Sequence, residues 1–326
     1  MYLLLYYAGR NSRPIVTYTY IVSRSDFFGY MTLTVDGNLM NDLMEVLSYT
    51  FGLSVLRLTL SGATGYGLNE VPCLFQLFSK GLHTSQARKL HENLWYSIWH
   101  ITSFAVGMWH MIHQPWVYDL FSRYDPEAVV AGYPQSAQSM GFKQFYLFEL
   151  GFWLSCCLFL GIETKRRDFV QMIVHHTSTI ILVTFSYLFD FTRGGILIMV
   201  LHDVGDVFLY SAKTAQYRKI HGLADLLFVF FVVAFFVARL FLLPVAVLYP
   251  LVLSLYKGTD SPGMAVIISF GRWLSLAILT SIFAILIGLH VMWGTIIARM
   301  VARIVRSRGA KTPSAAGGDP RSDDES

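Results

Sequence analysis

The feature that most constrains this sequence is a series of long apolar segments, each close to the length that crosses a bilayer. The clearest of them runs from Phe169 to Phe189 and contains no Asp, Glu, Lys or Arg. A helix needs about 20 mostly apolar residues to span the hydrocarbon core. An unpaired backbone N–H or C=O group is costly in lipid, and a helix pairs these groups within one segment, so such a segment forms a helix. The sequence therefore predicts an all-α, polytopic membrane helical bundle.

Seven segments have this character, and they predict about seven transmembrane helices. With 54% hydrophobic and only 14% charged residues, the 326-residue chain has too little charge to cover a soluble domain. The predicted spans are Leu43–Leu60, Leu94–Ile112, Phe142–Leu160, Phe169–Phe189, Gly194–Ala212, Leu226–Leu248 and Ala265–Ala298. The first is the weakest because it contains Glu45 and Arg57, and the last is too long for one straight span.

The chain divides into four predicted regions. An N-terminal segment of unclear structure covers residues 1–42, and a first span with its loop covers 43–88. A membrane domain of six spans follows at 89–308, and the acidic tail at 309–326 is expected to be disordered. The net charge is only +4, and no basic run interleaves with aromatic residues, so nucleic acid is not an expected partner.

Positive charges in the loops give the predicted orientation, since loops rich in Lys and Arg stay in the cytosol. The basic loops are two spans apart, so they share one side of the membrane with the C-terminal end. Their charges are Lys80, Arg88, Lys89, Lys165, Arg166, Arg167, Lys213, Arg218, Lys219, Arg299, Arg303, Arg306, Arg308 and Lys311. We therefore expect a cytosolic C-terminus and an N-terminus outside the cytosol or in a lumen.

Polar residues lie inside the predicted spans, where a charged side chain costs about 2.5–3.5 kcal/mol at mid-membrane. At a rise of 1.5 Å per residue, His175 and His176 lie about 10–12 Å below the cytosolic end of their span. By the same measure, Asp203 and Asp206 lie about 10–15 Å deep on the next span, with His202 only slightly deeper. We therefore expect these histidines and carboxylates to meet in the cytosolic half of the bundle.

Two interpretations of this cluster stay open at this point. A carboxylate that faces an imidazole fixes its tautomer and stabilises its charged form, which supplies a base or a nucleophile. His202 and Asp206 are four residues apart and share a helix face. In the structural alternative, a buried carboxylate pairs with an arginine only to hold helices together, and Arg239 can reach Asp203 from the deeper part of the bundle.

A metal centre and a proton-coupled transporter are further alternatives. Membrane desaturases hold two irons with repeated HxxxH and HxxHH clusters, but here only His175 and His176 have the right depth. Five other histidines lie near the opposite surface, isolated in a span, or in a loop: His110 and His113, His100, and His83 and His91. No metal or cofactor is therefore expected. A transporter needs a pathway open to both sides, whereas this polar cluster is confined to one half.

Residues 165–217 contain a set of short motifs in a fixed order. They are RRDF before the fourth span, His175–His176, Ser186–Tyr187, Arg193–Gly194, His202–Asp203, Asp206 and Ala212–Lys213. This order resembles the Lag1 motif of ceramide synthases, within the wider TRAM–Lag1–CLN8 (TLC) family, and a looser resemblance extends from about Lys89 to the last span. The chain departs from the usual pattern at Gly205, Tyr210 and Asp190, where the family usually has Ser, Glu and Asn.

The resemblance implies a six-helix TLC core preceded by an N-terminal span, and an acyltransferase activity. Ceramide synthases join the acyl group of a fatty acyl-CoA to the amine of a sphingoid base, giving ceramide or dihydroceramide. It implies His175 and His176 as the reactive pair, with Asp203 and Asp206 as orienting groups. Substrate-binding roles are expected for His202, Tyr187, Arg193, Arg166, Arg167 and Lys213.

The same resemblance implies the surroundings of the enzyme. The endoplasmic reticulum membrane is the expected location, and acyl-CoA, a sphingoid base and the lipid bilayer are the expected partners. A homo- or hetero-oligomer is left open. Arg166, Arg167 and Lys213 would hold the phosphates of acyl-CoA, although ordinary cytosolic charge explains them more simply.

Two mechanisms and one alternative function remain open from the sequence. A histidine either takes a proton from the ammonium, so that the amine attacks the thioester directly, or attacks first and forms an acyl-imidazole. The alternative function is a non-catalytic TLC protein that binds lipid or assists translocation. Such a protein would tolerate His175→Ala and His176→Ala. The preferred acyl-chain length and the type of sphingoid base cannot be inferred from these residues.

Overall fold

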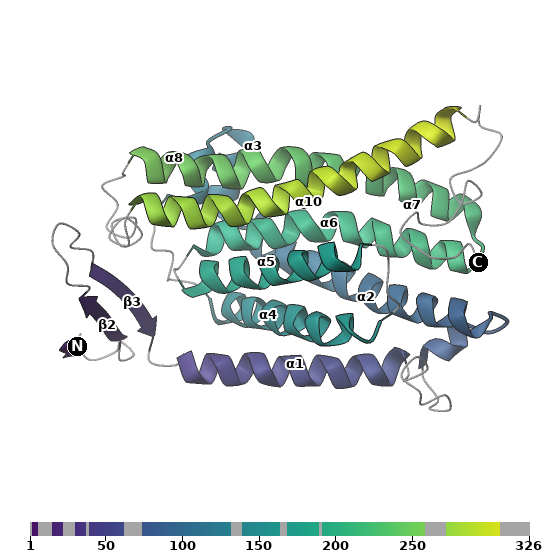
Figure 1. Cartoon of the computed structure of the whole chain (residues 1–326), viewed down its shortest axis with the longest axis horizontal. Helices are drawn as coiled ribbons and strands as arrows, with labels where there is room; N and C mark the ends of the chain where they lie inside the picture. The colour runs from purple at the N-terminus through teal and green to yellow at the C-terminus, as the bar shows by residue number, and fades with distance from the viewer. Residues whose placement is uncertain are drawn as a thin grey trace.

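Seven long helices of the described chain lie side by side along the longest axis of the computed structural model (Figure 1). The structure describes residues 2–5, 15–21, 30–36, 39–61, 74–131, 139–163, 168–188, 191–257 and 272–306. The first five long helices are α1 (Leu39–Ser61), α2 (Thr84–Ile112), α4 (Met140–Leu160), α5 (Phe169–Leu188) and α6 (Thr192–Tyr217). The sixth joins α7 (His221–Ala234), the π-helical η3 (Phe235–Leu242) and η4 (Pro244–Leu248), and α8 (Tyr249–Lys257), and the seventh is α10 (Arg272–Arg306). The predicted polytopic helical bundle is confirmed for the membrane part of the described chain.

Shorter elements join or precede these helices. The connecting pieces are η1 (Leu74–Phe78), α3 (Pro115–Ser122) and η2 (Pro126–Val129). Before α1, the strands β1 (Tyr2–Leu5), β2 (Ile15–Ile21) and β3 (Tyr30–Asp36) form an antiparallel sheet in the order β1-β2-β3, with Tyr18 opposite Leu3 and Leu33. The segments IVTYTYI and YMTLTVD are rich in β-branched and aromatic residues, which favour strands. The sequence pattern did not predict this sheet.

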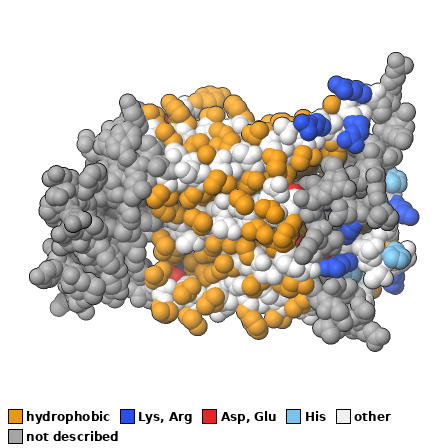
Figure 2. Space-filling model, in the orientation of Figure 1, with side chains coloured by type: hydrophobic (Ala, Val, Ile, Leu, Met, Phe, Trp, Pro, Cys, Tyr) orange, Lys and Arg blue, Asp and Glu red, His pale blue; other side chains and the backbone are white. Residues whose placement is uncertain are grey.

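The outer surface of the bundle is that of a multi-pass membrane protein. Among the described residues, five helices are long and apolar enough to cross a membrane: α1, α5, α6, the sixth helix over His221–Leu253 and α10 over Thr280–Arg306. Large apolar side chains such as Phe51, Val170 and Phe241 are exposed. Figure 2 shows hydrophobic side chains along the middle of the visible face and Lys and Arg at one end. Because such a surface is costly in water, it faces lipid.

Helix α6 is the centre of the bundle. Inside the protein, 67% of its membrane-spanning window is buried, compared with 22% for α1. Helix α2 approaches α6 very closely, since a Cβ added at Gly107 would lie only 2.7 Å from Cγ2 of Val200. A small residue at such a crossing lets two backbones come together. This contact brings the polar residues of α2 next to those of α6.

The sixth helix contains wide turns on both sides of Leu243. Pro244 has no amide hydrogen, and its ring clashes with the carbonyl group four residues earlier, so the regular α-helical pattern cannot continue there. The π-helical segments η3 and η4 accommodate this interruption. The helix is longer than the predicted span Leu226–Leu248, and η3 presents the buried Arg239 to the interior.

Helix α1 is fastened to the bundle near both of its ends. At one end, Asp42 accepts a hydrogen bond of 2.7 Å from the Tyr187 hydroxyl and lies 2.5 Å from Nζ of Lys143. At the other end, Arg57 forms an ion pair with Glu163. The span Leu43–Leu60, the weakest of the seven predictions, is therefore a helix packed on the bundle. The charge of Arg57, which weakened that prediction, is paired with Glu163.

Some predictions concern residues outside the described ranges. These are the tail at 309–326, the start of the last span at Ala265, and the positions of Asp190, Arg166 and Arg167. The predicted boundaries between the four regions of the chain stay predictions.

Candidate active site

The structure brings the histidines and carboxylates of α5 and α6 together, as the depth estimate predicted. His175, His176, His202, Asp203 and Asp206 are all buried. The ring centroids of His175 and His202 are 6.0 Å apart, and those of His175 and His176 are 5.9 Å apart. The fixed helical rise accounts for this agreement, since it places residues counted from the same end at the same level. The roles of these residues in a reaction stay predictions.

A histidine that the sequence analysis did not consider, His290 of α10, completes this cluster. Its Nε2 atom lies 3.2 Å from Nε2 of His202. Nδ1 of His202 lies 2.7 Å from the carbonyl oxygen of Ile198, which can only accept, so Nδ1 of His202 carries the hydrogen. In the neutral pair, Nε2 of His290 therefore donates to Nε2 of His202. The backbone of α6 thus fixes the tautomers of both rings.

His100 is also part of the cluster, so the expectation that it is isolated was wrong. Its Nδ1 atom lies 2.8 Å from Oδ1 of Asp203, and the Ser103 hydroxyl donates to Oδ2 of Asp203 at 2.5 Å. Both partners are on α2, which the Gly107 contact holds against α6. Asp203 therefore orients His100 rather than His175.

The depth estimate contained a signal for both missed histidines. His100 lies eleven residues from the basic end of its span at Lys89, which is about 16 Å. His290 lies nine residues from Arg299, which is about 13 Å. These depths match those of Asp203 and Asp206, so the same count along every span would have found them.

Asp206 is charge-balanced by the arginine that the structural alternative considered. Oδ2 of Asp206 lies 2.6 Å from the Arg239 guanidinium, which also donates to the backbone oxygen of His202 at 2.7 Å. The alternative had named Asp203 as the partner, and the pair instead forms with Asp206. Because η3 faces α6 at this point, the long side chain of Arg239 reaches the level of the carboxylates.

Three imidazole nitrogens in this cluster have no hydrogen-bond partner among the described residues. They are the Nδ1 atoms of His175, His176 and His290, and all three are buried. Buried polar groups are normally hydrogen-bonded, so each exception requires an explanation. No group of three or more His, Cys, Asp or Glu side chains in the described part of the chain is arranged to hold a metal ion. A substrate group can occupy these positions instead.

Two small cavities reach the cluster from opposite directions. The first, of about 30 Å³, is lined by Tyr96, Leu160, Glu163, Phe169, Met172, His176 and Tyr210. The second, of about 10 Å³, is lined by Glu149, Trp153, Thr179, Leu182, Val183, Gly195, Ile198, Met199, His202, Asp203 and Leu286. Ligand pockets usually measure about 300–1,000 Å³. Both cavities are far smaller than such a pocket.

The remaining predicted site residues lie away from the histidines. Tyr187 is twelve residues from His175 along α5, about 18 Å, where its hydroxyl bonds to Asp42. Arg193, at the same end of the bundle, donates to the backbone oxygen of Ala128 at 2.8 Å. Lys213 is buried near the basic end of α6. The structure does not bring Tyr187 or Arg193 to the cluster.

Together, the fold and this cluster define a polytopic membrane protein with a buried histidine and carboxylate site between its helices. The model of the TLC domain (TRAM, Lag1, CLN8) matches residues 89–299. The chain belongs to the TLC domain family. The match begins within α2, so α1 precedes it.

Ceramide synthases are among the curated relatives of this chain. Ceramide synthase 5 of Homo sapiens is 31% identical over 268 residues, which is 82% of this chain and 62% of that protein. Ceramide synthase 4 of Bos taurus is 30% identical over 242 residues, 74% of this chain and 57% of that protein. Ceramide synthase LOH2 of Arabidopsis thaliana is 28% identical over 238 residues, 73% and 75% of the two chains. The chain thus spans about three fifths of the two mammalian relatives.

Proposed function

We propose that this chain is a ceramide synthase, which transfers the acyl group of a fatty acyl-CoA to the amine of a sphingoid base. The observation that carries the proposal is the buried pair His175 and His176, whose Nδ1 atoms have no hydrogen-bond partner among the described residues. The names of the relatives support the reaction class. A buried polar group without a partner costs about 1–3 kcal/mol, so a substrate group that bonds to these two nitrogens would recover that cost.

The reaction needs a group that accepts a proton inside the membrane. The sphingoid ammonium first loses a proton, and the nitrogen then attacks the thioester carbonyl carbon. A carbon–nitrogen bond forms, the carbon–sulfur bond breaks, and the second proton that the nitrogen loses on becoming an amide goes to the CoA thiolate. A neutral imidazole accepts the proton in the direct route. In the other route, an imidazole nitrogen attacks the thioester first, and the amine then resolves the acyl-imidazole.

The surrounding groups hold this chemistry in place. Arg239 balances the charge of Asp206 and fixes the backbone at His202. His290 and His202 have fixed tautomers, so the positions of the ring hydrogens of His202, which lies next to His175, do not change. We assign His175 and His176 as the reacting residues, and Asp203 and Asp206 as positioning residues that act through His100 and Arg239.

The basic end of the bundle suits the head group of acyl-CoA. Lys213, Arg218 and Lys219 lie at the end of α6 or just after it, on the side from which the first cavity reaches His176. We propose that this end faces the cytosol at the endoplasmic reticulum and that its charges hold the CoA phosphates. Tyr187 and Arg193, at the other end, can contact only the far part of a long acyl or sphingoid chain.

The proposal is tested with microsomes from cells that lack their own ceramide synthases. The cells express the wild-type chain or the His175→Ala/His176→Ala variant, and the microsomes receive a sphingoid base and a panel of acyl-CoAs. We expect N-acylated product from the wild type and a loss of at least 10²-fold in the variant, the range for removing a general acid–base group. The panel also gives the preferred acyl-chain length.

The amount of each protein in the membrane is measured in the same samples. Product formation at an equal rate by both versions would contradict the assignment of the histidines. If neither version forms product although both are inserted and stable, the non-catalytic lipid-binding function takes first place.

A further inference from the structure

We propose that Glu163 binds the cationic amine of the acceptor substrate, at the outer end of the cavity that leads to His176. Arg57 holds the Glu163 carboxylate before the substrate arrives. This inference rests on the proposed function and deepens it, because it names the group that recognises one of the two substrates. It also gives α1 a part in the site, although α1 precedes the residues that the TLC domain model matches.

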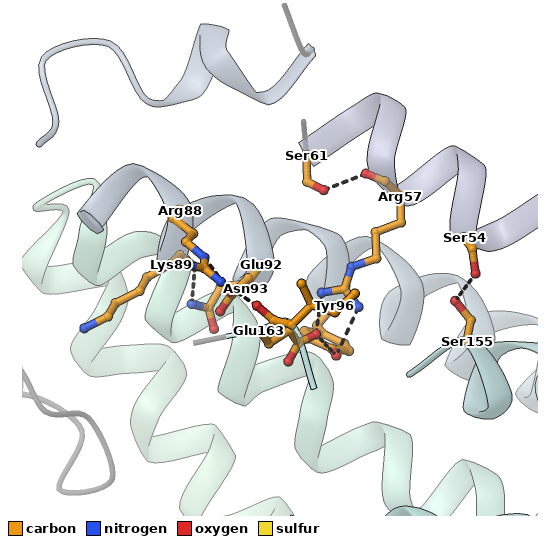
Figure 3. Close-up of polar contacts among 11 residues, drawn as sticks. Ser54, Arg57, Ser61, Arg88, Lys89, Glu92, Asn93, Tyr96, Ser155 and Glu163 are labelled. Carbon is orange, nitrogen blue, oxygen red and sulfur yellow. Dashed lines mark hydrogen bonds and ion pairs between the residues drawn. The ribbon is translucent and has the colours of Figure 1, made fainter. Parts of the chain in front are cut away.

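Glu163 lies just after α4, where three side chains converge (Figure 3). The Arg57 guanidinium forms an ion pair with Oε1 of Glu163, and the Tyr96 hydroxyl donates to the same atom at 2.5 Å. Arg57 also donates to the Tyr96 oxygen at 3.4 Å. The Glu163 side chain is only 11% exposed. A carboxylate in such surroundings interacts strongly with a cation, because little water screens it.

The cavity next to Glu163 connects this carboxylate with His176, one of the two proposed reacting residues. Glu163, Tyr96, Tyr210 and His176 all line it. The polar head of a sphingoid base lies at the membrane surface, which is the level where α4 ends. An amine that enters there meets Glu163 first and His176 deeper in the same cavity. The order of these groups matches a path from recognition to reaction.

The two aspartates near the histidines are already engaged. Asp203 accepts from His100 and Ser103, and Asp206 is paired with Arg239. These partners are fixed parts of the bundle, and none of them is replaced without leaving a buried group unsatisfied. Glu163 also has a buried cationic partner, but it lies at the edge of the bundle and lines the cavity, where its carboxylate can bind a second cation beside Arg57.

The positive charge of Arg57 stays partly stabilised when the Glu163 carboxylate binds another cation. Its guanidinium lies 4.3 Å from the Phe159 ring centroid and 5.2 Å from that of Tyr96, so two aromatic faces support the charge. When an ammonium group binds Glu163, a second cation joins Arg57 at the carboxylate. Arg57 stays in place, so the entering ammonium adds one positive charge, and the carboxylate and the two aromatic faces stabilise the two cations together.

A purely structural role is the competing explanation, since the same ion pair ties α1 to the bundle. The two explanations differ in their effect on the Michaelis constants of the two substrates. Loss of an anchor affects folding and both substrates, whereas loss of an amine site affects the amine alone. Glu92 provides a matched control, because it also pairs with an arginine, Arg88 at 3.5 Å, and does not line the cavity.

The experiment measures KM for the sphingoid base and for acyl-CoA in microsomes that contain the wild type, Glu163→Gln or Glu92→Gln. Glu163→Gln keeps the shape and the Tyr96 contact but removes the charge. We expect KM for the base to rise about tenfold or more, the effect of losing a hydrogen bond to a charged group. KM for acyl-CoA should stay within about twofold, as should both constants of Glu92→Gln.

A second variant, Arg57→Gln, removes the competing cation, and we expect it to lower KM for the base. Thermal unfolding in detergent is measured for every variant, so that a folding defect is recognised. Glu163→Asp keeps the negative charge, and its KM for the base should lie closer to the wild-type value than that of Glu163→Gln. An unchanged amine KM in Glu163→Gln, a parallel rise of both constants, or no fall in Arg57→Gln overturns the inference. If the wild type itself forms no product, the proposed function fails and this inference fails with it.

Discussion

The histidine cluster and the contact between Arg57 and Glu163 both lie inside the bundle, but they differ in whether their polar groups have hydrogen-bond or ion-pair partners. At Arg57, the opposite charge of Glu163 and the hydroxyl of Tyr96 meet the guanidinium directly. In the histidine cluster, His175 and His176 each keep a buried ring nitrogen without a partner among the described residues. Around them, Asp203 and Asp206 are fully engaged by His100, Ser103 and Arg239, as described above.

This difference separates ion pairs, which hold helices together in the free protein, from ring nitrogens that have no partner in the described part of the free protein. A satisfied buried pair fixes a geometry, and its loss leaves a partner exposed to a low dielectric. An unsatisfied buried nitrogen lowers the stability of the free protein, by about 1–3 kcal/mol. It is retained where a ligand completes its hydrogen bonds. The comparison therefore predicts that deleting one partner of a buried charge pair costs stability, whereas changing an unpaired histidine of the cluster costs activity.

The largest expected effect on stability comes from Asp206→Ala. It leaves the buried Arg239 guanidinium without its carboxylate, and breaking such a pair costs about 3–5 kcal/mol. We expect a markedly lower Tm in detergent and less protein in the membrane. In the double variant Asp206→Leu/Arg239→Met, both charges are absent, and most of the lost stability should return. A double variant as unstable as Asp206→Ala would show that the pair is not the source of the effect.

Asp203→Asn should affect activity more than stability. The amide side chain of this variant would keep an acceptor for His100 but remove the negative charge, so the fold survives while the charge balance around the histidines changes. We expect kcat to fall by about 10–100-fold, with KM for acyl-CoA nearly constant, because a hydrogen bond to a charged group contributes about 1.5–3 kcal/mol. Ser103→Ala, which keeps the charge, is the control and should lose less activity. Equal losses in both variants would argue for a packing role.

The smallest effect is expected from Gly205→Ser, which restores the residue usual in ceramide synthases. A Cβ at this position would lie 3.5–3.7 Å from the Arg239 guanidinium, which is ordinary contact. The Ser hydroxyl can accept a hydrogen bond from that group. We expect a change in the free energy of unfolding within about 0.5 kcal/mol and an activity within about twofold. A large gain of activity would show that Gly205 limits the natural rate.

The sequence predicted those features of the fold and site that follow from fixed helical geometry. The positions of the spans, and the meeting of His175 with His202, need only the apolar pattern and the rise per residue. The partners of Asp203 and Asp206 were not predicted, because they depend on how helices rotate and approach one another. Gly107 and the π-helical turns near Pro244 determine that approach, and neither appears in a hydropathy pattern.

The contact between Arg57 and Glu163 is a second feature that the sequence could not predict. In the sequence, Arg57 only weakens the prediction of the first span, since its partner is 106 residues away. Glu163 lies beyond the end of the predicted third span, where a charge needs no explanation. Only the folded chain shows that the two side chains meet beside a cavity that reaches His176.

The central claim is that the chain transfers an acyl group at the His175 and His176 pair, and a defined system tests it most directly. The purified chain in lipid nanodiscs receives acyl-CoA and a sphingoid base, and N-acylated product is measured for the wild type and for His175→Gln, His176→Gln and His91→Gln. His91 is the matched control, because it is also buried but its Nδ1 lies 2.9 Å from the Ser61 carbonyl oxygen, outside the cluster. The account predicts product from the wild type and His91→Gln, and at least a 10²-fold loss in both cluster variants at equal Tm. Undiminished product from His175→Gln and His176→Gln would contradict it.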